Sequence, residues 1–433
     1  MIFEKITKRF NLNFQQIYFG CVLLVAATIP FPIKANNLAI VFLIILWSIG
    51  IVRKKFDFKG FLSSPLHILL WLIFFFHLFG LTYSSHIHDG LKKLERLLPF
   101  FAFPLLLFPL KDIKYKYSKT ILNAFISACL IATLIALSGA LLKTLGTQSF
   151  FTYNPTTKVN EYHFYYHQLG SHIGLHAVYF SIYIALSHLI IIDKVLFDFS
   201  SYKLRTKVLL VFLSIYLPII LYLLSSVTIT FAWIACLIIQ VLLYFKKSNL
   251  LVRKKSLIIP FILFFISVLF VGYKTLNEKI NLKNIGQFDY TDDVYSRNWG
   301  TLNTRLAKWA CAYEVLMENF WLGSGTGGET YILLDKYEEK GFILGLQKEF
   351  NPHNQFLTFG ITLGVFSIAI FILLLSWLLY LAIKQKNHSF LLFIILFTLF
   401  SLTESTLATN KGIIFFVFFS LYFTHISQCR AKI

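Results

Sequence analysis

Long apolar segments recur along almost the whole chain, and they limit its fold more than any other feature of the sequence. A membrane-spanning helix needs about 20 mostly apolar residues. Segments of this kind lie at about 17–33, 37–52, 61–81, 94–110, 119–142, 172–192, 207–224, 228–245, 256–273, 355–383, 389–407 and 412–428. We therefore predict about twelve transmembrane helices. The fourth segment contains Pro99, Pro104 and Pro109, so its ends are the hardest to place.

Composition supports an all-α polytopic membrane protein. Hydrophobic residues make up 57% of the chain and charged residues only 14%, which argues against a soluble multidomain enzyme. The net charge of +20 would suggest nucleic acid as the partner of a soluble protein. Here, however, the excess Lys and Arg residues lie in alternate loops, as the positive-inside rule requires of cytoplasmic loops. We therefore expect the membrane as partner, no nucleic acid, and cytoplasmic N- and C-termini.

This topology divides the chain into three parts. Residues 1–273 hold helices one to nine, residues 274–352 form a 79-residue loop on the outer face, and residues 353–433 hold helices ten to twelve. A second outer segment, 143–171, is rich in aromatic residues and histidine, and it suits an interfacial belt at the lipid headgroups.

Within the large loop, residues 301–320 are predicted to form an amphipathic helix packed on the membrane domain. Apolar residues recur there at helical spacing, at Leu302, Leu306, Trp309, Tyr313, Leu316 and Phe320. Arg305 and Lys308 flank this stripe. A guanidinium at an apolar boundary can bind phosphate through two hydrogen bonds, which fits a lipid-linked pyrophosphate. The alternative is an interfacial arginine that stacks on Trp309.

Two polar groups stand beside predicted spans. His353 and Asn354 lie where helix ten begins, and a neutral imidazole there can accept a proton from an acceptor hydroxyl. Glu404 is the clearest intramembrane carboxylate, and such groups are candidates for function. The simpler interpretations are a structural histidine and a Glu404 that pairs with Lys411.

Arginine is rare in the predicted outer segments. Besides Arg305, they contain Arg96, at the start of helix four, and Arg297. Their presence among acidic residues suggests that guanidinium groups bind an anion there, although snorkelling to the interface explains Arg96 equally well.

Two further patterns favour ordinary structural roles. The glycine-rich stretch 323–329 follows a predicted helix and lacks the Lys of a nucleotide-binding loop, so we interpret it as a helix terminator. The histidines at 163, 167, 172 and 176 form two i,i+4 pairs, but no carboxylate or cysteine completes a zinc motif. We predict neither a metal nor a cofactor.

The motifs NTRLAKWACAYEVLMENFWLGSGTGG and PHNQFLTFGITLGVFS, within residues 297–366, resemble the signature of the O-antigen ligase and polymerase superfamily of bacterial envelope enzymes. HAVYFSIY and SLTES, at 176–183 and 401–405, also resemble the family. The resemblance implies a fold like that of the C-type glycosyltransferases in the bacterial inner membrane, with a periplasmic active site. One departure is Val227, where many family members have arginine; Arg96 or Arg297 is the expected replacement.

The resemblance implies metal-independent transfer of a glycan from undecaprenyl pyrophosphate to an acceptor sugar. Arg305 would bind the donor pyrophosphate and His353 would act as general base or orient the acceptor, with Asn354 beside it. We expect an inverting ligase whose acceptor is lipid A-core. An O-antigen or exopolysaccharide polymerase is the nearest alternative. A lipid-glycan transporter or flippase is a third possibility, but it would predict charges near the bilayer midplane and short loops.

Overall fold

Most of the chain is helical in a computed structural model that describes residues 13–112, 115–155, 159–248, 285–294, 296 and 299–430. The helices before the large loop are α2 (Phe14–Thr28), α3 (Ile33–Val52), α4 (Pro65–Gly80), α5 (Ile87–Leu107), α6 (Tyr115–Thr147), α7 (Tyr166–Ser171), α8 (Ala177–Phe197), α9 (Leu204–Leu224) and α10 (Val227–Ser248). Two short 3-10 helices, η1 (Phe108–Asp112) and η2 (Phe199–Ser201), follow α5 and α8. Strands β1 (Phe151–Asn154) and β2 (Val159–Tyr162) pair antiparallel, with Phe151 opposite Tyr162.

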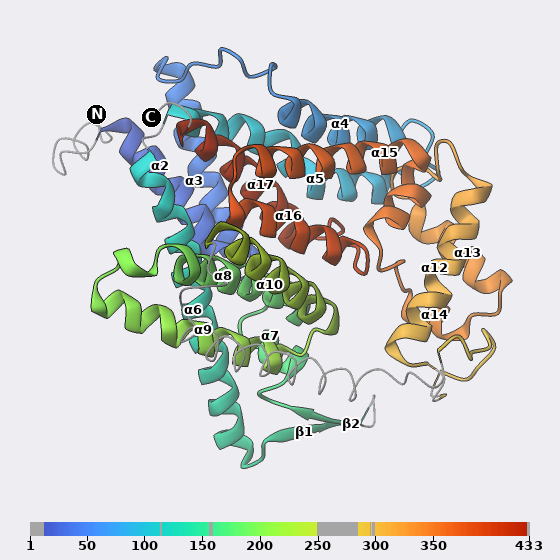
Figure 1. Ribbon diagram of the computed structural model, residues 1–433. Helices are drawn as coiled ribbons and strands as arrows, with labels where there is room; N and C mark the ends of the chain where they lie inside the picture. The colour runs from blue at the N-terminus through green and yellow to red at the C-terminus, as the bar shows by residue number, and fades with distance from the viewer. Residues whose placement is uncertain are drawn as a thin grey trace.

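The second half contains α12 (Thr301–Glu318), α13 (Glu329–Glu339), α14 (Ile343–Lys348), α15 (Gln355–Lys384), α16 (His388–Ser401) and α17 (Asn410–Arg430). Helices α4, α5, α15, α16 and α17 run side by side (Figure 1). Helices α12 to α14 gather at one end of this bundle, opposite the start of α2 and the end of α17.

Six helices in the described part of the chain are long and apolar enough to cross a membrane. They are Ile33–Val52, Lys119–Thr147, Ala177–Phe197, Leu204–Leu224, Val227–Lys246 and Gln355–Lys384. The predicted segment 256–273 lies outside the described residues, and each of the other eleven predicted segments overlaps a helix. The structure therefore agrees with an all-α membrane protein, while the number of spans, twelve, remains a prediction.

The prolines of the fourth segment do not break α5, which continues through Pro99 and Pro104. Proline has no N–H, so Pro109 cannot donate to the carbonyl of Leu105. The indole of Trp47 donates to this carbonyl instead, at 3.1 Å. The carbonyl that proline leaves without a hydrogen bond thus gains a donor from α3. In an apolar environment, each backbone polar group needs such a partner.

Helix α12 confirms the predicted amphipathic helix, and it packs on α15 as expected, but only part of the predicted stripe is buried: Leu316 lies in the core, whereas two other members do not. Tyr313 is 56% exposed and Phe320 36%. The hydrophobic core that α12 shares with α13 and α14 instead contains small residues, among them Ala307, Cys311 and Ala312. Small side chains allow a helix to approach its neighbours closely, so the buried face here is not the face with the largest residues.

Candidate active site

Arg305, Glu404 and His353 meet at the end of the bundle that carries α12. One carboxylate oxygen of Glu404 accepts a hydrogen bond from Arg305 Nη2 at 2.8 Å, and the other lies 2.7 Å from His353 Nδ1. Each of the three side chains is mostly buried, with Arg305 and Glu404 both 17% exposed. Glu404 therefore bridges the two residues for which sequence alone predicted phosphate binding and proton transfer. The alternative interpretation, in which Glu404 pairs with Lys411, was wrong. Lys411 Nζ instead donates to the backbone carbonyls of Ile29 and Phe31.

Three different elements position these side chains. Arg305 lies in the second turn of α12, and Glu404 lies in the turn between α16 and α17, where its N–H donates to Phe400 O at 3.0 Å. His353 precedes the first turn of α15 and has a left-handed backbone, with φ of 48°. A residue other than glycine adopts this conformation only when its surroundings hold it there. Here Asn351 Oδ1 accepts from the N–H of His353 at 2.9 Å.

The protonation of the cluster follows from its contacts. Burial by itself would raise the pKa of Glu404, but the hydrogen bond from His353 and the charge of Arg305 bring this pKa below its ordinary value. At neutral pH the Glu404 carboxylate can only accept hydrogen bonds. The proton of the hydrogen bond to His353 must therefore be on Nδ1 of the imidazole. In the neutral imidazole, Nε2 then has the free lone pair and can take a proton from a substrate.

Asn354 acts as the N-cap of α15. Its Oδ1 accepts from the N–H groups of Phe356 and Leu357, and its Nδ2 donates to Leu402 O at 3.0 Å. These contacts join α15 to the end of α16, near Glu404. A contact between Asn354 and substrate remains a prediction.

Arg96 does not join the cluster. Arg96 is exposed, and its Nη1 donates to Ala408 O at 3.2 Å. Arg297 lies outside the described residues, so a role for it in replacing the family arginine at Val227 stays a prediction.

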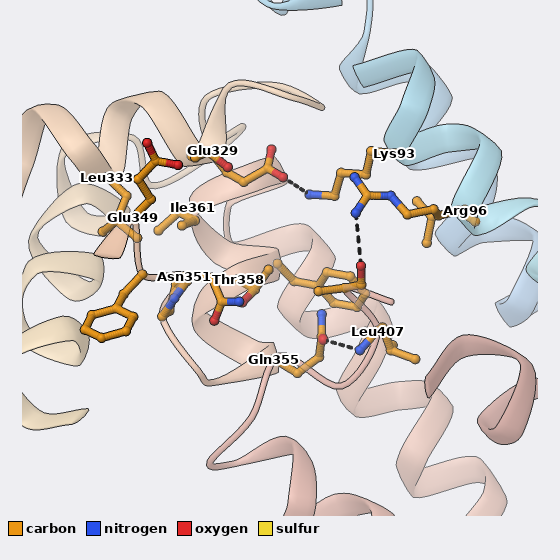
Figure 2. Close-up of a pocket in the computed structure, with 16 residues that line it drawn as sticks. Lys93, Arg96, Glu329, Leu333, Glu349, Asn351, Gln355, Thr358, Ile361 and Leu407 are labelled. Atoms are coloured by element: carbon orange, nitrogen blue, oxygen red, sulfur yellow. Dashed lines mark hydrogen bonds and ion pairs between the residues drawn. The ribbon is translucent and has the colours of Figure 1, made fainter. Parts of the chain in front are cut away.

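A cavity of about 180 Å³ adjoins the cluster, between α5, α13 and the start of α15. Figure 2 shows Arg96, Glu349, Asn351 and Gln355 among its lining residues. Lys93 and Glu329, which also line it, form an ion pair of 2.5 Å, which balances both charges. Lys93 also donates to Thr362 at 3.1 Å. Opposite charges and amides around an apolar wall suit a neutral polar ligand better than a phosphate.

The glycine-rich stretch does more than end a helix, as we had interpreted it. The N–H groups of Ser324 and Gly325 donate to the carbonyls of Ile361 and Thr362, both at 2.9 Å. These carbonyls lie next to a break in α15 at Gly364, where φ is +68° and ψ is −166°. The loop therefore docks the outer segment onto the membrane bundle.

Neither i,i+4 histidine pair lies on one helix, because α7 contains only residue 167 of the four and α8 begins after residue 176. His163 lies between the hydroxyls of Thr144 and Thr152, at 3.0 and 2.8 Å. The ring of His167 instead packs on that of His176, with centroids 4.3 Å apart. Within the described parts of the chain, no group of three or more His, Cys, Asp or Glu side chains is placed to hold a metal.

Lys308, to which the sequence assigned no role, lies one turn beyond Arg305 and is only 4% exposed. Its Nζ lies 4.5 Å from the ring centroid of Phe350, which also packs edge-on against His353 at 6.2 Å. Burial, together with the charge of Arg305, lowers the pKa of Lys308 to about 7. The only signal in the sequence was its i+3 spacing from Arg305.

The apolar helices and the polar cluster at one end of the bundle define an integral membrane protein with a buried charged site. Residues 209–372 match the family model described as O-antigen ligase, which is the family that the sequence motifs resemble. The matched region includes Arg305 and His353 but ends before Glu404. The family covers O-antigen ligases and polymerases, and the match therefore supports an enzyme. No curated protein matched the chain.

Proposed function

We propose that this protein is an O-antigen ligase-like glycosyltransferase on the periplasmic face of the bacterial inner membrane. It would move a glycan from undecaprenyl pyrophosphate to a sugar hydroxyl of lipid A-core. The observation that carries the proposal is the Glu404 carboxylate that bridges His353 Nδ1 and Arg305 Nη2. It supports the proposal because a general base at His353 would act beside a guanidinium in a mostly buried site.

In the proposed reaction, His353 Nε2 takes the proton of the acceptor hydroxyl while the oxygen attacks the anomeric carbon of the donor sugar. The bond from this carbon to the pyrophosphate oxygen breaks, and the configuration inverts because attack and departure occur on opposite faces. Glu404 stabilises the imidazolium that forms. Arg305 has five N–H donors and gives Glu404 one of them, so others remain for the departing pyrophosphate.

The cavity beside the cluster is where we place the acceptor sugar. Its balanced charges and free amide donors suit a polyol, and Asn351, which orients His353, lines it. A lipid acceptor must approach through the membrane plane. The β1–β2 hairpin exposes aromatic side chains that suit the headgroup region, namely Phe150, Phe151, Tyr153 and Tyr162.

Deletion of the gene in its host tests the proposal and separates ligase from polymerase. Loss of a ligase should leave bare lipid A-core, with full-length polymer retained on undecaprenyl pyrophosphate. A core capped by a single repeat unit would instead identify a polymerase and overturn the choice of acceptor. Complementation with His353→Ala should fail although the protein inserts normally, and complementation at the wild-type level would refute the role of His353.

A further inference from the structure

The Lys308 side chain is largely buried, with 4% of the residue exposed, and its ammonium has no hydrogen-bond acceptor among the described residues. Other largely buried lysines have oxygen partners. Lys93 donates to Glu329 and Thr362, Lys336 to Glu318 and Glu339, and Lys411 to two backbone carbonyls. Lys308 has only the face of the Phe350 ring, 4.5 Å from Nζ. A buried cation with so few contacts is unfavourable unless a further partner arrives.

The charge of the neighbouring cluster shows what kind of partner would fit. Glu404 neutralises Arg305, and a neutral His353 adds no charge. The pyrophosphate diester of the proposed donor carries two negative charges. Arg305 alone, already paired, cannot balance them, whereas Lys308 lies one helical turn away and adds a second cation.

We propose that Lys308 is a second cationic ligand of the donor pyrophosphate, covered by Phe350 until the donor binds. This inference rests on the proposed function and adds a donor-binding residue to the same site. Phe350 suits the role of cover because its ring lines the cavity and contacts both Lys308 and His353. A shift of this one ring would open the ammonium to the site.

The protonation of Lys308 gives the proposal a specific pH dependence. Its pKa of about 7 in the free protein results first from burial and then from Arg305 on the same helix, and Glu404, in the turn before α17, opposes both. The other titratable groups that face this cluster include His353, ahead of α15, Tyr166 at the start of α7 and His176 before α8. A bound dianion favours the ammonium, so donor binding above pH 7 takes up one proton from solvent. Donor affinity must therefore fall as the pH rises.

The test measures the Kd of a polyprenyl diphosphate-linked sugar for the full-length protein in nanodiscs between pH 6.5 and 9. Such a diester does not titrate in this range. For the wild type we expect Kd to rise about fivefold from pH 7 to 8 and about tenfold more from pH 8 to 9. Lys308→Met should bind at least about tenfold more weakly at pH 7, with no pH dependence. Lys308→Arg should bind well, also without pH dependence, since arginine stays charged.

Lys340→Met is the matched control, because it removes an ammonium that pairs with Glu314 away from the cluster, and it should keep the wild-type profile. A wild-type pH slope in Lys308→Met, or in Lys308→Arg if the Met variant does not fold, would overturn the proposal. Unchanged Kd with lost turnover in Lys308→Met would also overturn it, because Lys308 would then be a proton acceptor. If the wild type neither binds nor transfers the probe sugar, the proposed function itself is wrong.

Discussion

The substitution Glu404→Gln tests the central geometry, because an amide cannot reproduce both contacts of the carboxylate. One carboxylate oxygen accepts from Arg305 and the other from His353. Glutamine has one oxygen and one NH2 group. If its oxygen faces Arg305, its NH2 faces His353 Nδ1, which must then accept. The imidazole proton moves to Nε2, and the general base is lost.

The expected size of the effect follows from this change of tautomer. General base catalysis typically contributes about 10²–10⁴-fold to the rate, so we expect kcat to fall by this amount. A hydrogen bond to a charged group contributes about 1.5–3 kcal/mol, so losing it alone would slow the reaction only about 10- to 150-fold. Glu404→Asp keeps the charge and both acceptors, although it shortens the side chain by one methylene, and it should lose less activity than Gln.

The assay is single-turnover transfer from a lipid-linked donor to an acceptor lipid in nanodiscs, with separation of the products by mass. Thermal unfolding of the same samples shows whether each variant is folded. Glu318→Gln is the control, because it removes the same charge from an exposed carboxylate that pairs with Lys336. Transfer by Glu404→Gln within threefold of the wild-type rate would refute the assignment of His353 as an oriented base.

Three further predictions test other parts of the site. Arg305→Lys keeps the charge but loses the planar guanidinium, so transfer should fall severely, and full activity would exclude two-bond phosphate binding. Transfer should persist in excess EDTA, because Arg305 and Lys308 supply the positive charge; activity lost to EDTA and restored by zinc or magnesium would contradict this. Gly364→Ala should lower the unfolding temperature, because its Cβ would lie 2.1 Å from Trp321 O at a φ of +68°. Gly20→Ala, where nothing lies within 4 Å, should not lower it.

The sequence was sufficient to locate the helices and to single out Arg305, His353 and Glu404, because each signal is local. Apolar runs identify spans, and a charged group beside a span stands out against its surroundings. Their contact could not be predicted, since Arg305 and Glu404 are 99 positions apart and come from elements with no shared pattern. Lys411 was the nearest cation to Glu404 in sequence, but in the folded chain it binds the carbonyls that end α2.

The errors on α12 and on the glycine-rich stretch share a physical cause. Local sequence patterns do not determine which residues of one element contact another, and packing between the elements decides this. The stripe on α12 was predicted from side-chain size, whereas α12 buries small residues against its neighbours. The stretch 323–328 was interpreted through its own helix, whereas the N–H groups of Ser324 and Gly325 donate to carbonyls at a break in α15. Neither partner is visible in the sequence near these residues.

The first part of α15, residues 355–362, ties together the three elements that build the cluster. It begins directly after His353, and near its far end Ile361 and Thr362 accept hydrogen bonds from the loop that follows α12, which carries Arg305. On its side, Gln355 accepts from Leu407 N at 2.7 Å and Thr358 lies 2.8 Å from the Ser405 hydroxyl, in the turn of Glu404. Because these anchors all lie on one short helical segment that ends at the Gly364 break, we expect a shift of that segment to move His353, Glu404 and Arg305 together.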